Sequence, residues 1–394
     1  MQPELNIGLF GHVDHGKTTL TKMLTGKWTD THSEEIKRGI TIKIGYADME
    51  IRRCKKCGMY SNKKECPFCG SKTELKRKVS FVDAPGHESL MATAISASAV
   101  IDGALFIIAA NEKCPQEQTK EHLMVLELLG VKNIVIVQTK VDVVSKERAI
   151  ENYNEIKNFV KGTVAENAPI IPVSSTYNLN AHYVIEAIDK FIPTPKRDET
   201  KEPLAYIIRS FDINQPGKKV DEMVGGVLGG TIVQGVFRVG DEVEIAPGIK
   251  TESGYVRLST KITSLKSGSE DLEEAKPGGL IAFGTLLDPS LTKSDLLAGR
   301  IMGLKGTLPN ETSELRLKYS LLNRKDIENP LLKEGEPLLL NIHATPTSGV
   351  IVKLEKKRAI VRLKRPVIAV KGDKIAISRR IGQRWRLAGL GIVD

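Results

Sequence analysis

The residues best suited to chemistry begin near the N-terminus, in the stretch GHVDHGKTTL at positions 11–20. It fits the pattern G-x-x-x-x-G-K-[ST], which ends here at Lys17 and Thr18. Backbone N–H groups of such a loop can point at phosphate oxygens, and the start of the following helix adds partial positive charge. Lys17 would reach the β- and γ-phosphates, and the Thr18 hydroxyl would bind Mg²⁺. The stretch predicts a nucleotide-phosphate site formed by Asp14, His15, Gly16, Lys17, Thr18 and Thr19.

Two further motifs follow strand-like runs, and the second of them selects the base. DAPGH at 83–87 follows KVSFV, so Asp83 can hold a Mg²⁺-bound water and the Gly86 N–H can approach the γ-phosphate. TKVD at 139–142 ends the run NIVIVQTK. Asp142 can accept two hydrogen bonds, from N1–H and the exocyclic amino group of guanine, whereas adenine offers no such pair. The stem of Lys140 can cover the ring, and the predicted base is therefore guanine.

The guanine pocket departs from the common motif at its first position. Asn is usual there, and this chain has Thr139. A hydroxyl can still tie neighbouring loops together but lacks an amide donor, which predicts somewhat looser guanine binding without loss of specificity. SST at 174–176 follows IIPV, and backbone N–H groups of Ser174, Ser175 and Thr176 would complete the pocket near the guanine O6.

The stretch RGITI at 38–42 predicts a conformational switch. Thr41 can coordinate Mg²⁺ through its hydroxyl and contact the γ-phosphate through its N–H, and both contacts are lost after hydrolysis. Together with the phosphate loop, DAPGH and TKVD, this stretch predicts binding of GTP and GDP with Mg²⁺.

Four cysteines form a separate candidate site in CKKCGMYSNKKECPFCG at 54–70. Cys54 and Cys57 repeat the spacing of Cys66 and Cys69, and a glycine follows each pair. Four thiolates satisfy tetrahedral zinc without an open position, which predicts a structural Zn²⁺ site. A pair of disulfides is the alternative, and a reducing compartment disfavours it. The fifth cysteine, Cys114, is expected to be an ordinary free thiol.

The elements that must position these residues follow from length and pattern. A chain of 394 residues suggests two or three domains. Apolar runs alternate with helical stretches over the first two hundred residues, and short alternating strands with glycine turns follow. We predict an α/β P-loop GTPase domain with a mainly parallel sheet at 1–200, with the zinc knuckle 54–69 inserted. Two small β-barrels follow at 201–308 and 309–394.

Charge is concentrated near the C-terminal end. Residues 353–386 contain thirteen Lys or Arg against Glu355 and Asp373, a net +11 in a chain whose total is +10. A solvated face is one interpretation, and a surface for RNA or the ribosome is the favoured one. The sequence has no run of eighteen apolar residues and begins with the polar stretch QPE, so we expect a cytoplasmic protein without membrane span or signal peptide.

The motifs GHVDHGKT, RGITI and DAPGH together resemble the translational GTPases, the class of elongation factor Tu. This resemblance implies that His87 positions the water that attacks the γ-phosphate. It also implies that Val13 and Ile40 form an apolar gate, which keeps His87 from that water until a partner acts.

Within this class, the cysteine insertion after KIGYADMEI, the stretch HSEEIKRG, the later VGGVLGGTIVQG and the ending ISRRIGQRWRLAGLGIV resemble the gamma subunits of initiation factor 2, of the archaeal type because long extensions are absent. The resemblance implies delivery of methionyl initiator tRNA to the small ribosomal subunit, GTP hydrolysis, and a heterotrimer with alpha and beta subunits. It implies a second Mg²⁺ held partly by Asp14 and the Gly39 carbonyl. SST stands where this family tends to have Ser-Ala, a departure confined to the guanine pocket.

Three other interpretations stay open. A selenocysteine-type tRNA-delivery elongation factor would share this architecture, although it should carry a further C-terminal domain. A GTPase subunit of a sulfate-activating enzyme would fit the basic barrel less well, and a stand-alone zinc module would not explain the GTP motifs. Tyr46 is the candidate for the aminoacyl pocket, since an aromatic ring beside the switch could pack on the methionine thioether. A strand core residue is the equal alternative for Tyr46.

Overall fold

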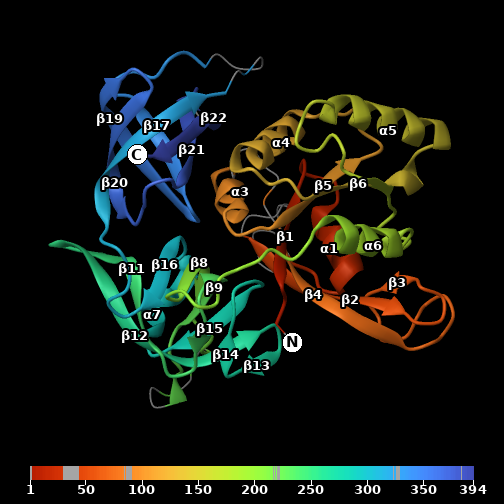
Figure 1. Ribbon diagram of the computed structural model, residues 1–394, viewed down its shortest axis with the longest axis horizontal. Helices are drawn as coiled ribbons and strands as arrows, with labels where there is room; N and C mark the ends of the chain where they lie inside the picture. Colours follow the sequence, from red (N-terminus) through yellow and green to blue (C-terminus); the bar gives the residue numbers. More distant parts are fainter. Residues whose placement is uncertain are drawn as a thin grey trace. The chain divides into compact units, whose positions relative to one another are not determined.

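The computed structural model describes residues 2–29, 44–83, 85, 91–215, 217, 219, 222–322, 324, 329–382 and 384–394. The chain divides into two compact units, Pro3–Lys196 and Arg197–Asp394 (Figure 1). The divide falls in a linker with three prolines, FIPTPKRDETKEP at 191–203, between the α/β pattern and the strands that follow.

The first unit alternates strands with helices. Its described strands are β1 (Leu5–Phe10), β2 (Gly45–Cys54), β3 (Tyr60–Ser61), β4 (Thr73–Asp83), β5 (Gly103–Ala109), β6 (Ile134–Thr139) and β7 (Ile170–Pro172). Its described helices are α1 (Lys17–Thr25), α3 (Met91–Ser98), α4 (Glu117–Leu129), the 3₁₀ helix η2 (Val141–Val143), α5 (Lys146–Val160) and α6 (Ala181–Phe191).

These strands form one sheet in the order β3-β2-β4-β1-β5-β6-β7. The neighbours from β4 to β7 run parallel, and β2 pairs antiparallel with β4. The predicted mainly parallel sheet is confirmed. Because parallel strands end at a shared edge, the stretches after β1, β4, β6 and β7 meet there, and these are the predicted motifs.

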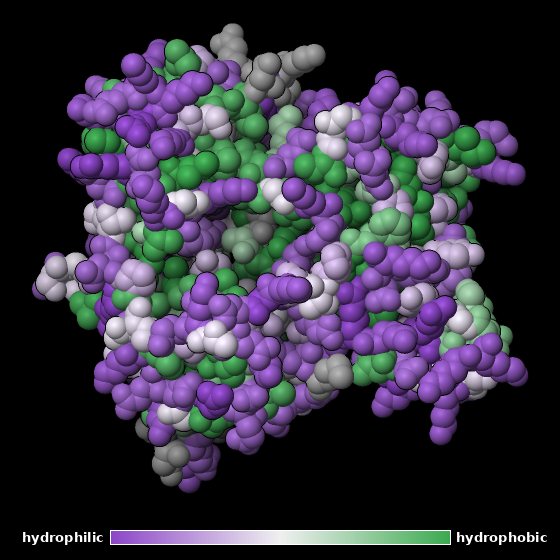
Figure 2. Space-filling view, in the orientation of Figure 1, coloured by the Kyte–Doolittle hydropathy of each residue, from purple (hydrophilic) through white to green (hydrophobic). Residues whose placement is uncertain are grey.

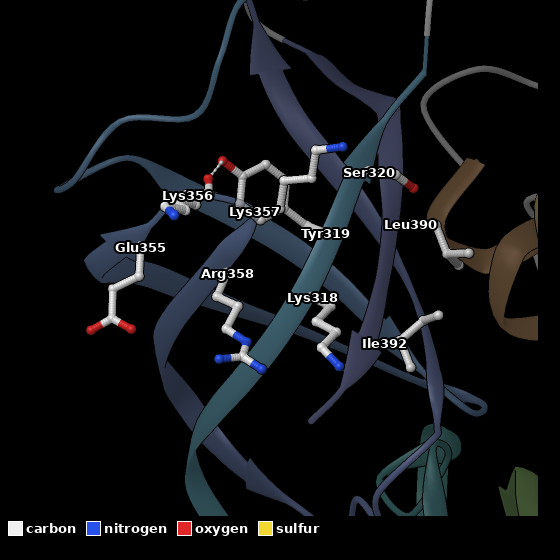
Figure 3. A pocket seen from close by; sticks show the side chains of 9 residues that line it. All are labelled: Lys318, Tyr319, Ser320, Glu355, Lys356, Lys357, Arg358, Leu390 and Ile392. Carbon is white, nitrogen blue, oxygen red and sulfur yellow. Dashed lines mark hydrogen bonds between the residues drawn. The ribbon is translucent and has the colours of Figure 1, made fainter.

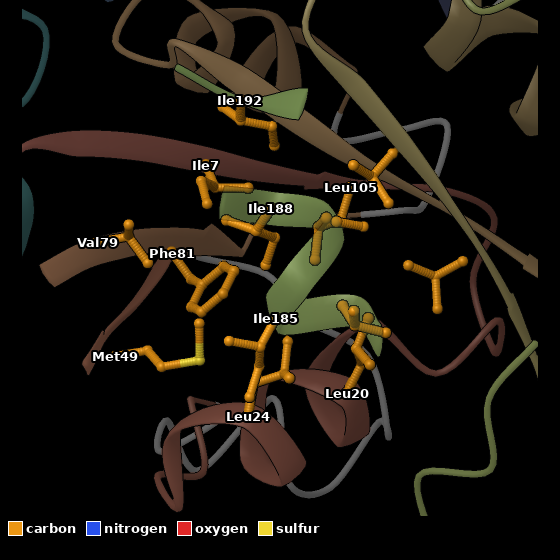
Figure 4. Packing of buried hydrophobic residues seen from close by; sticks show 14 of the residues in the cluster. Ile7, Leu20, Leu24, Met49, Val79, Phe81, Leu105, Ile185, Ile188 and Ile192 are labelled. Carbon is orange, nitrogen blue, oxygen red and sulfur yellow. The ribbon is translucent and has the colours of Figure 1, made fainter. Parts of the chain in front are cut away.

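β1 is buried along its whole length because helices cover both faces of the sheet. On one face, Leu20 and Leu24 of α1 and Ile185 and Ile188 of α6 pack against sheet residues that include Phe81 (Figure 4). On the other face, the rings of Phe106 and Phe159 lie 6.4 Å apart between β5 and α5. This packing holds the shared strand edge rigid.

The second unit contains two β-barrels, as predicted. The first comprises β8 (Leu204–Phe211), β9 (Val227–Gln234), β10 (Phe237–Arg238), β11 (Glu242–Thr251), β12 (Gly254–Ser267), β13 (Glu270–Leu272), β14 (Glu274–Ala275), β15 (Ile281–Thr285) and β16 (Arg300–Leu304), with the short helices α7 (Pro289–Thr292) and η4 (Lys293–Asp295). Its main sheet runs β11-β16-β8-β9-β15-β12, and the pairing of β11 with β12 closes it.

The second barrel is closed in the order β17-β20-β19-β18-β21-β22. Its strands are β17 (Thr312–Leu321), β18 (Pro337–Ile342), β19 (Thr345–Glu355), β20 (Arg358–Val367), β21 (Lys374–Ile381) and β22 (Arg384–Val393). Buried and exposed residues alternate along β20 up to Leu363, so one face fills the barrel and the other meets solvent. The predicted break between the barrels, at residue 308, lies between β16 and β17.

Hydrophilic side chains cover most of the surface seen in Figure 2, with smaller apolar areas among them. Among the helices that the structure describes, none has the length and apolar character needed to span a bilayer.

Candidate functional site

The loop that joins β1 to α1 has the backbone conformation that its glycines allow. Gly11 has φ +152°, and a Cβ atom there would lie 2.3 Å from the Ile107 carbonyl oxygen. Gly16 caps α1 with φ +84°, in the left-handed region that favours glycine. A side chain at residue 11 would therefore displace the loop from β5, and we infer that glycine is needed at this position.

Buried polar contacts hold this loop in place. The Lys17 side chain is 6% exposed, and its Nζ donates to the carbonyl oxygens of Gly11 at 3.0 Å and His12 at 2.8 Å. The His15 ring lies between the Ile107 carbonyl, 3.0 Å from Nδ1, and the Glu112 carboxylate, 3.2 Å from Nε2. Burial lowers the pKa of His15 to about 4. The His15 ring thus connects the loop to Ile107 and Glu112, while the Lys17 ammonium provides the positive charge of the loop.

Asp83 lies at the end of β4, opposite Leu9 of β1, and is fully buried. Its Oδ2 accepts hydrogen bonds from Thr18 Oγ1 at 2.9 Å and from Thr29 Oγ1 at 2.8 Å. Hydroxyl and carboxylate oxygens are the donor set that Mg²⁺ prefers. Thr18 and Asp83 were predicted from the sequence as site residues, but Thr29 was not, because the stretch KWTD matches no known motif.

The predicted base-pocket residues follow two neighbouring parallel strands, β6 and β7. Thr139 Oγ1 donates to the His15 carbonyl at 2.7 Å, so its hydroxyl ties this edge to the phosphate loop. Lys140 has φ +58°, and Asp142 in η2 is exposed. Ser175 Oγ is buried without a hydrogen-bond partner among the described residues. The strand ends therefore bring the TKVD and SST stretches together.

A histidine that was not predicted from the sequence forms a hydrogen bond with the backbone of the phosphate loop. His122 of α4 accepts a hydrogen bond at Nδ1 from the Gly11 N–H, at 2.8 Å. Burial lowers the pKa of His122 to about 3, with the charge of Lys17 as the next cause. The ring is therefore neutral, and its acceptor nitrogen satisfies a loop N–H. Nothing in the stretch TKEHLMV indicates this contact, which depends on how α4 packs.

Several predicted residues lie outside the described ones: Gly39, Ile40, Thr41, Gly86 and His87. Val13 is half-buried in the phosphate loop. Tyr46 of β2 pairs with Val82 of β4 and is also half-buried. The next residue of β2, Ala47, is deeply buried. Because neighbouring residues of a strand point to opposite faces, Tyr46 lies on the face away from the core residue Ala47.

The four cysteines of the insertion lie together at the far end of β2. Their sulfurs are all within 4.8 Å of one another, and Cys54–Cys69 and Cys57–Cys66 are each 3.5 Å apart. These distances exclude disulfides, and all four thiols are free. Zn–S bonds of about 2.3 Å in a tetrahedron would separate the sulfurs by about 3.8 Å. The cluster therefore fits a tetrahedral zinc ion.

The backbone of the knuckle favours thiolates. Gly58 and Gly70, both in the left-handed region, donate their N–H groups to the carbonyls of Cys54 and Cys66 and so close two similar turns. The pKa of Cys69 is lowered to about 6, chiefly by the backbone N–H of Ser71. For Cys57, the backbone N–H of Met59 acts in the same direction, but burial and hydrogen bonds with the other three cysteines raise the pKa to about 12.

The fifth cysteine lies apart from this cluster. Cys114 is buried, and burial raises the pKa of its thiol to about 12. A thiol in that state is a poor nucleophile and a poor metal ligand.

The basic segment 353–386 runs from the end of β19 into β22. One of its cations is structural: Arg379 is buried, and its Nη2 donates to Glu336 Oε2 at 3.0 Å. Lys356, Lys357 and Arg358, at the turn between β19 and β20, are exposed. The segment therefore presents a basic surface, although not all of its thirteen cations contribute to it.

Comparison with known proteins adds the family context. The family described as "Elongation factor Tu GTP binding domain" matches residues 2–194, "Elongation factor Tu domain 2" matches 225–300, and "Initiation factor eIF2 gamma, C terminal" matches 313–393. The chain is 55% identical to translation initiation factor 2 subunit gamma of Pyrococcus horikoshii over 401 residues, which covers all of this chain and 98% of the relative. The same subunit of Methanocaldococcus jannaschii is 54% identical with the same coverage.

Solved structures show the same fold. A bacterial selenocysteine-specific elongation factor superposes with a TM-score of 0.75 at 25% identity; all of this chain is covered, and it spans 58% of that protein. Elongation factor SelB of Methanococcus maripaludis, solved with the GTP analogue GppNHp, gives a TM-score of 0.74 at 24% identity and 79% coverage. At this identity the second likeness shows the fold alone.

Proposed function

Because this chain belongs to the gamma subunits of translation initiation factor 2, which are GTPases that hydrolyse GTP to GDP, we propose that it binds methionyl initiator tRNA in the GTP state and delivers it to the small ribosomal subunit. We further propose that it does so in the cytoplasm, as one subunit of a heterotrimer with alpha and beta subunits. The observation that supports an RNA partner best is the C-terminal barrel: it matches the initiation factor family and contains the basic segment.

The nucleotide site would work through residues at the shared strand edge. Lys17 would neutralise the β- and γ-phosphates, and loop N–H groups from Asp14 to Thr19 would bind their oxygens. Thr18 and Thr41 would hold Mg²⁺, and Asp83 would hold a water bound to it; the ion, when bound, neutralises charge that develops on the phosphates. A second Mg²⁺ would lie by Asp14 and the Gly39 carbonyl. Asp142, Lys140 and the SST stretch would bind guanine, with Thr139 securing the pocket to the loop.

Hydrolysis would depend on His87, with Val13 and Ile40 as the gate. In such a mechanism positioning of the attacking water dominates, because phosphoryl transfer needs little covalent chemistry from the protein. The Gly86 N–H would contact the γ-phosphate beside His87. Tyr46, on the face of β2 away from the core residue Ala47, is the proposed contact for the methionine side chain.

We propose that Cys54, Cys57, Cys66 and Cys69 hold one structural Zn²⁺. Metal analysis of the purified chain should then find one zinc per molecule. The Cys66→Ser, Cys69→Ser double variant should lose the metal and keep GTP binding, because the knuckle lies at the opposite end of β2 from the nucleotide site. Cys114→Ala is the matched control and should keep full zinc. Zinc retained in the double variant would exclude this site.

The delivery step is tested by sedimentation. Labelled methionyl initiator tRNA, assembled with all three subunits and GTP, should co-sediment with small ribosomal subunits, and replacement of GTP by GDP should release most of it. Equal retention with both nucleotides would contradict a GTP-dependent carrier. Co-sedimentation of selenocysteinyl-tRNA instead, or purification with a sulfurylase subunit, would favour the corresponding alternative.

A further inference from the structure

A groove with a volume of about 790 Å³ lies on the outer face of the C-terminal barrel (Figure 3). It crosses three neighbouring strands, β22, β17 and β20. The pairing register places Lys318 between Ile392 on one side and Arg358 on the other, and pairs Ser320 with Leu390. The groove is therefore formed by residues of these three strands together with the turn between β19 and β20.

The floor of the groove is apolar and contains one aromatic ring. Leu390 and Ile392 line it from β22, and Tyr319 lines it from β17 (Figure 3). Tyr319 is half-buried because it also packs against the barrel core. Its Oη donates to the Lys356 carbonyl at 3.3 Å, and its backbone N–H donates to the Lys357 carbonyl at 2.9 Å. The ring is thus fixed by two contacts to the β19–β20 turn.

The rim of the groove is positively charged. Lys318 and Arg358 share one carboxylate, that of Asp394, at 3.2 and 3.0 Å. Glu355 also lines the groove, and its carboxylate pairs at 2.6 Å with Lys353, which lies outside the groove. The ammonium groups of Lys356 and Lys357 are exposed and have no carboxylate partner among the described residues. Two uncompensated cations therefore flank an apolar, aromatic floor.

We propose that this groove binds one unpaired nucleotide of RNA, with the base against Tyr319 and its flanking phosphates beside Lys356 and Lys357. The inference rests on the proposed function in requiring an RNA partner, and it adds a site on the barrel to the tRNA contact proposed at Tyr46. Bases stack on aromatic rings whatever their sequence, and lysines bind the backbone as point charges.

An acidic peptide would need the cations but would make little use of the apolar floor. A paired RNA strand would present phosphates without a free base. Stacking and charge together favour an unpaired nucleotide over either of these ligands, so the contribution of the ring is the property to measure.

The experiment is fluorescence anisotropy with the full chain and a labelled single-stranded oligoadenylate, compared with the same strand paired to oligouridylate. We expect the single strand to bind more tightly. Lys356→Glu with Lys357→Glu should weaken its binding about 10-fold at low salt and reduce the salt slope by about 1.4. Arg362→Glu with Lys364→Glu, also exposed on β20 but outside the groove, is the matched control and should change the affinity much less.

The ring is tested by two variants of one residue. Tyr319→Leu should weaken single-strand binding about 10-fold, whereas Tyr319→Phe should stay within about twofold of the parent, because stacking needs the ring and not the hydroxyl. Circular dichroism of both variants shows whether the barrel is intact. If Tyr319→Leu perturbs the barrel, the comparison of the single strand with the paired strand in the parent chain still tests whether a free base contributes to binding.

Equal losses in the groove and control variants, or equal binding of single and paired strands, would overturn the proposal. Loss of alpha- or beta-subunit binding in the groove variants, with RNA affinity unchanged, would also overturn it and would assign the groove to an acidic protein surface. The parent chain is assayed in parallel for GTP-dependent binding of initiator tRNA. A failure there would remove the proposed function and leave the oligonucleotide result to stand on its own.

Discussion

The Asp142→Asn variant is expected to bind GTP about 100-fold or more weakly than the parent and to gain affinity for xanthosine triphosphate. The proposed pocket has one carboxylate that accepts hydrogen bonds from both N1–H and the exocyclic amino group of guanine. Hydrogen bonds to a charged group contribute about 1.5–3 kcal/mol each, so loss of this pair costs at least about 3 kcal/mol, which is more than 100-fold. An amide can instead donate to the 2-oxo group of xanthine.

Equilibrium titration with fluorescent GTP and XTP analogues measures both affinities. Glu147→Gln is the matched control, because Glu147 is another exposed acid in the first turn of the next helix, α5. It should leave the preference for guanine unchanged. Full GTP affinity in the Asp142→Asn protein would show that the base binds elsewhere.

His87→Ala should abolish partner-stimulated GTP hydrolysis while affinities for GTP and tRNA remain close to those of the parent. For related GTPases, what a partner supplies is worth about 10³ to 10⁵ in rate, and the proposal assigns to His87 the positioning of water on which this stimulation acts. The side chain is not required for binding, so only the chemical step should slow. In the isolated subunit, the gate of Val13 and Ile40 should keep hydrolysis slow even with His87 present.

Single-turnover hydrolysis in assembled initiation complexes is the measurement. His182→Ala, at a half-buried position of α6, controls for loss of a histidine in the same unit and should hydrolyse GTP at the parent rate. A stimulated rate for His87→Ala within about threefold of the parent corresponds to only ~0.7 kcal/mol of barrier and would refute the role.

Local pattern was enough to predict the architecture. Helices that alternate with mainly apolar strands predict a parallel sheet, because the strands of such a sheet are covered by helices on both faces. β1 and β5 are accordingly buried along their whole length. The loss of helical periodicity after the linker predicts the barrels. Fixed spacing also predicts the phosphate loop and the cysteine cluster, since each lies within one short stretch whose geometry its own residues determine.

Contacts that depend on packing could not be predicted in the same way. Thr29 reaches Asp83, and His122 reaches Gly11, across large separations in sequence. Neither has a spacing rule, because the approach depends on how a loop or helix packs on the sheet. The groove at Tyr319 is similar: it exists only because closure of the barrel places β22 beside β17. Charge counting indicated a basic surface but could not show that it surrounds an aromatic floor.

We propose above all that the chain selects initiator tRNA and that GTP controls this selection. Filter binding of initiator and elongator methionyl-tRNA, each with GTP and with GDP, tests it most directly, because the amino acid is the same and only the tRNA body and the nucleotide change. We expect tight binding for the initiator with GTP and clearly weaker binding in the other three combinations. Equal binding of the two tRNAs, or of one tRNA with both nucleotides, would contradict it.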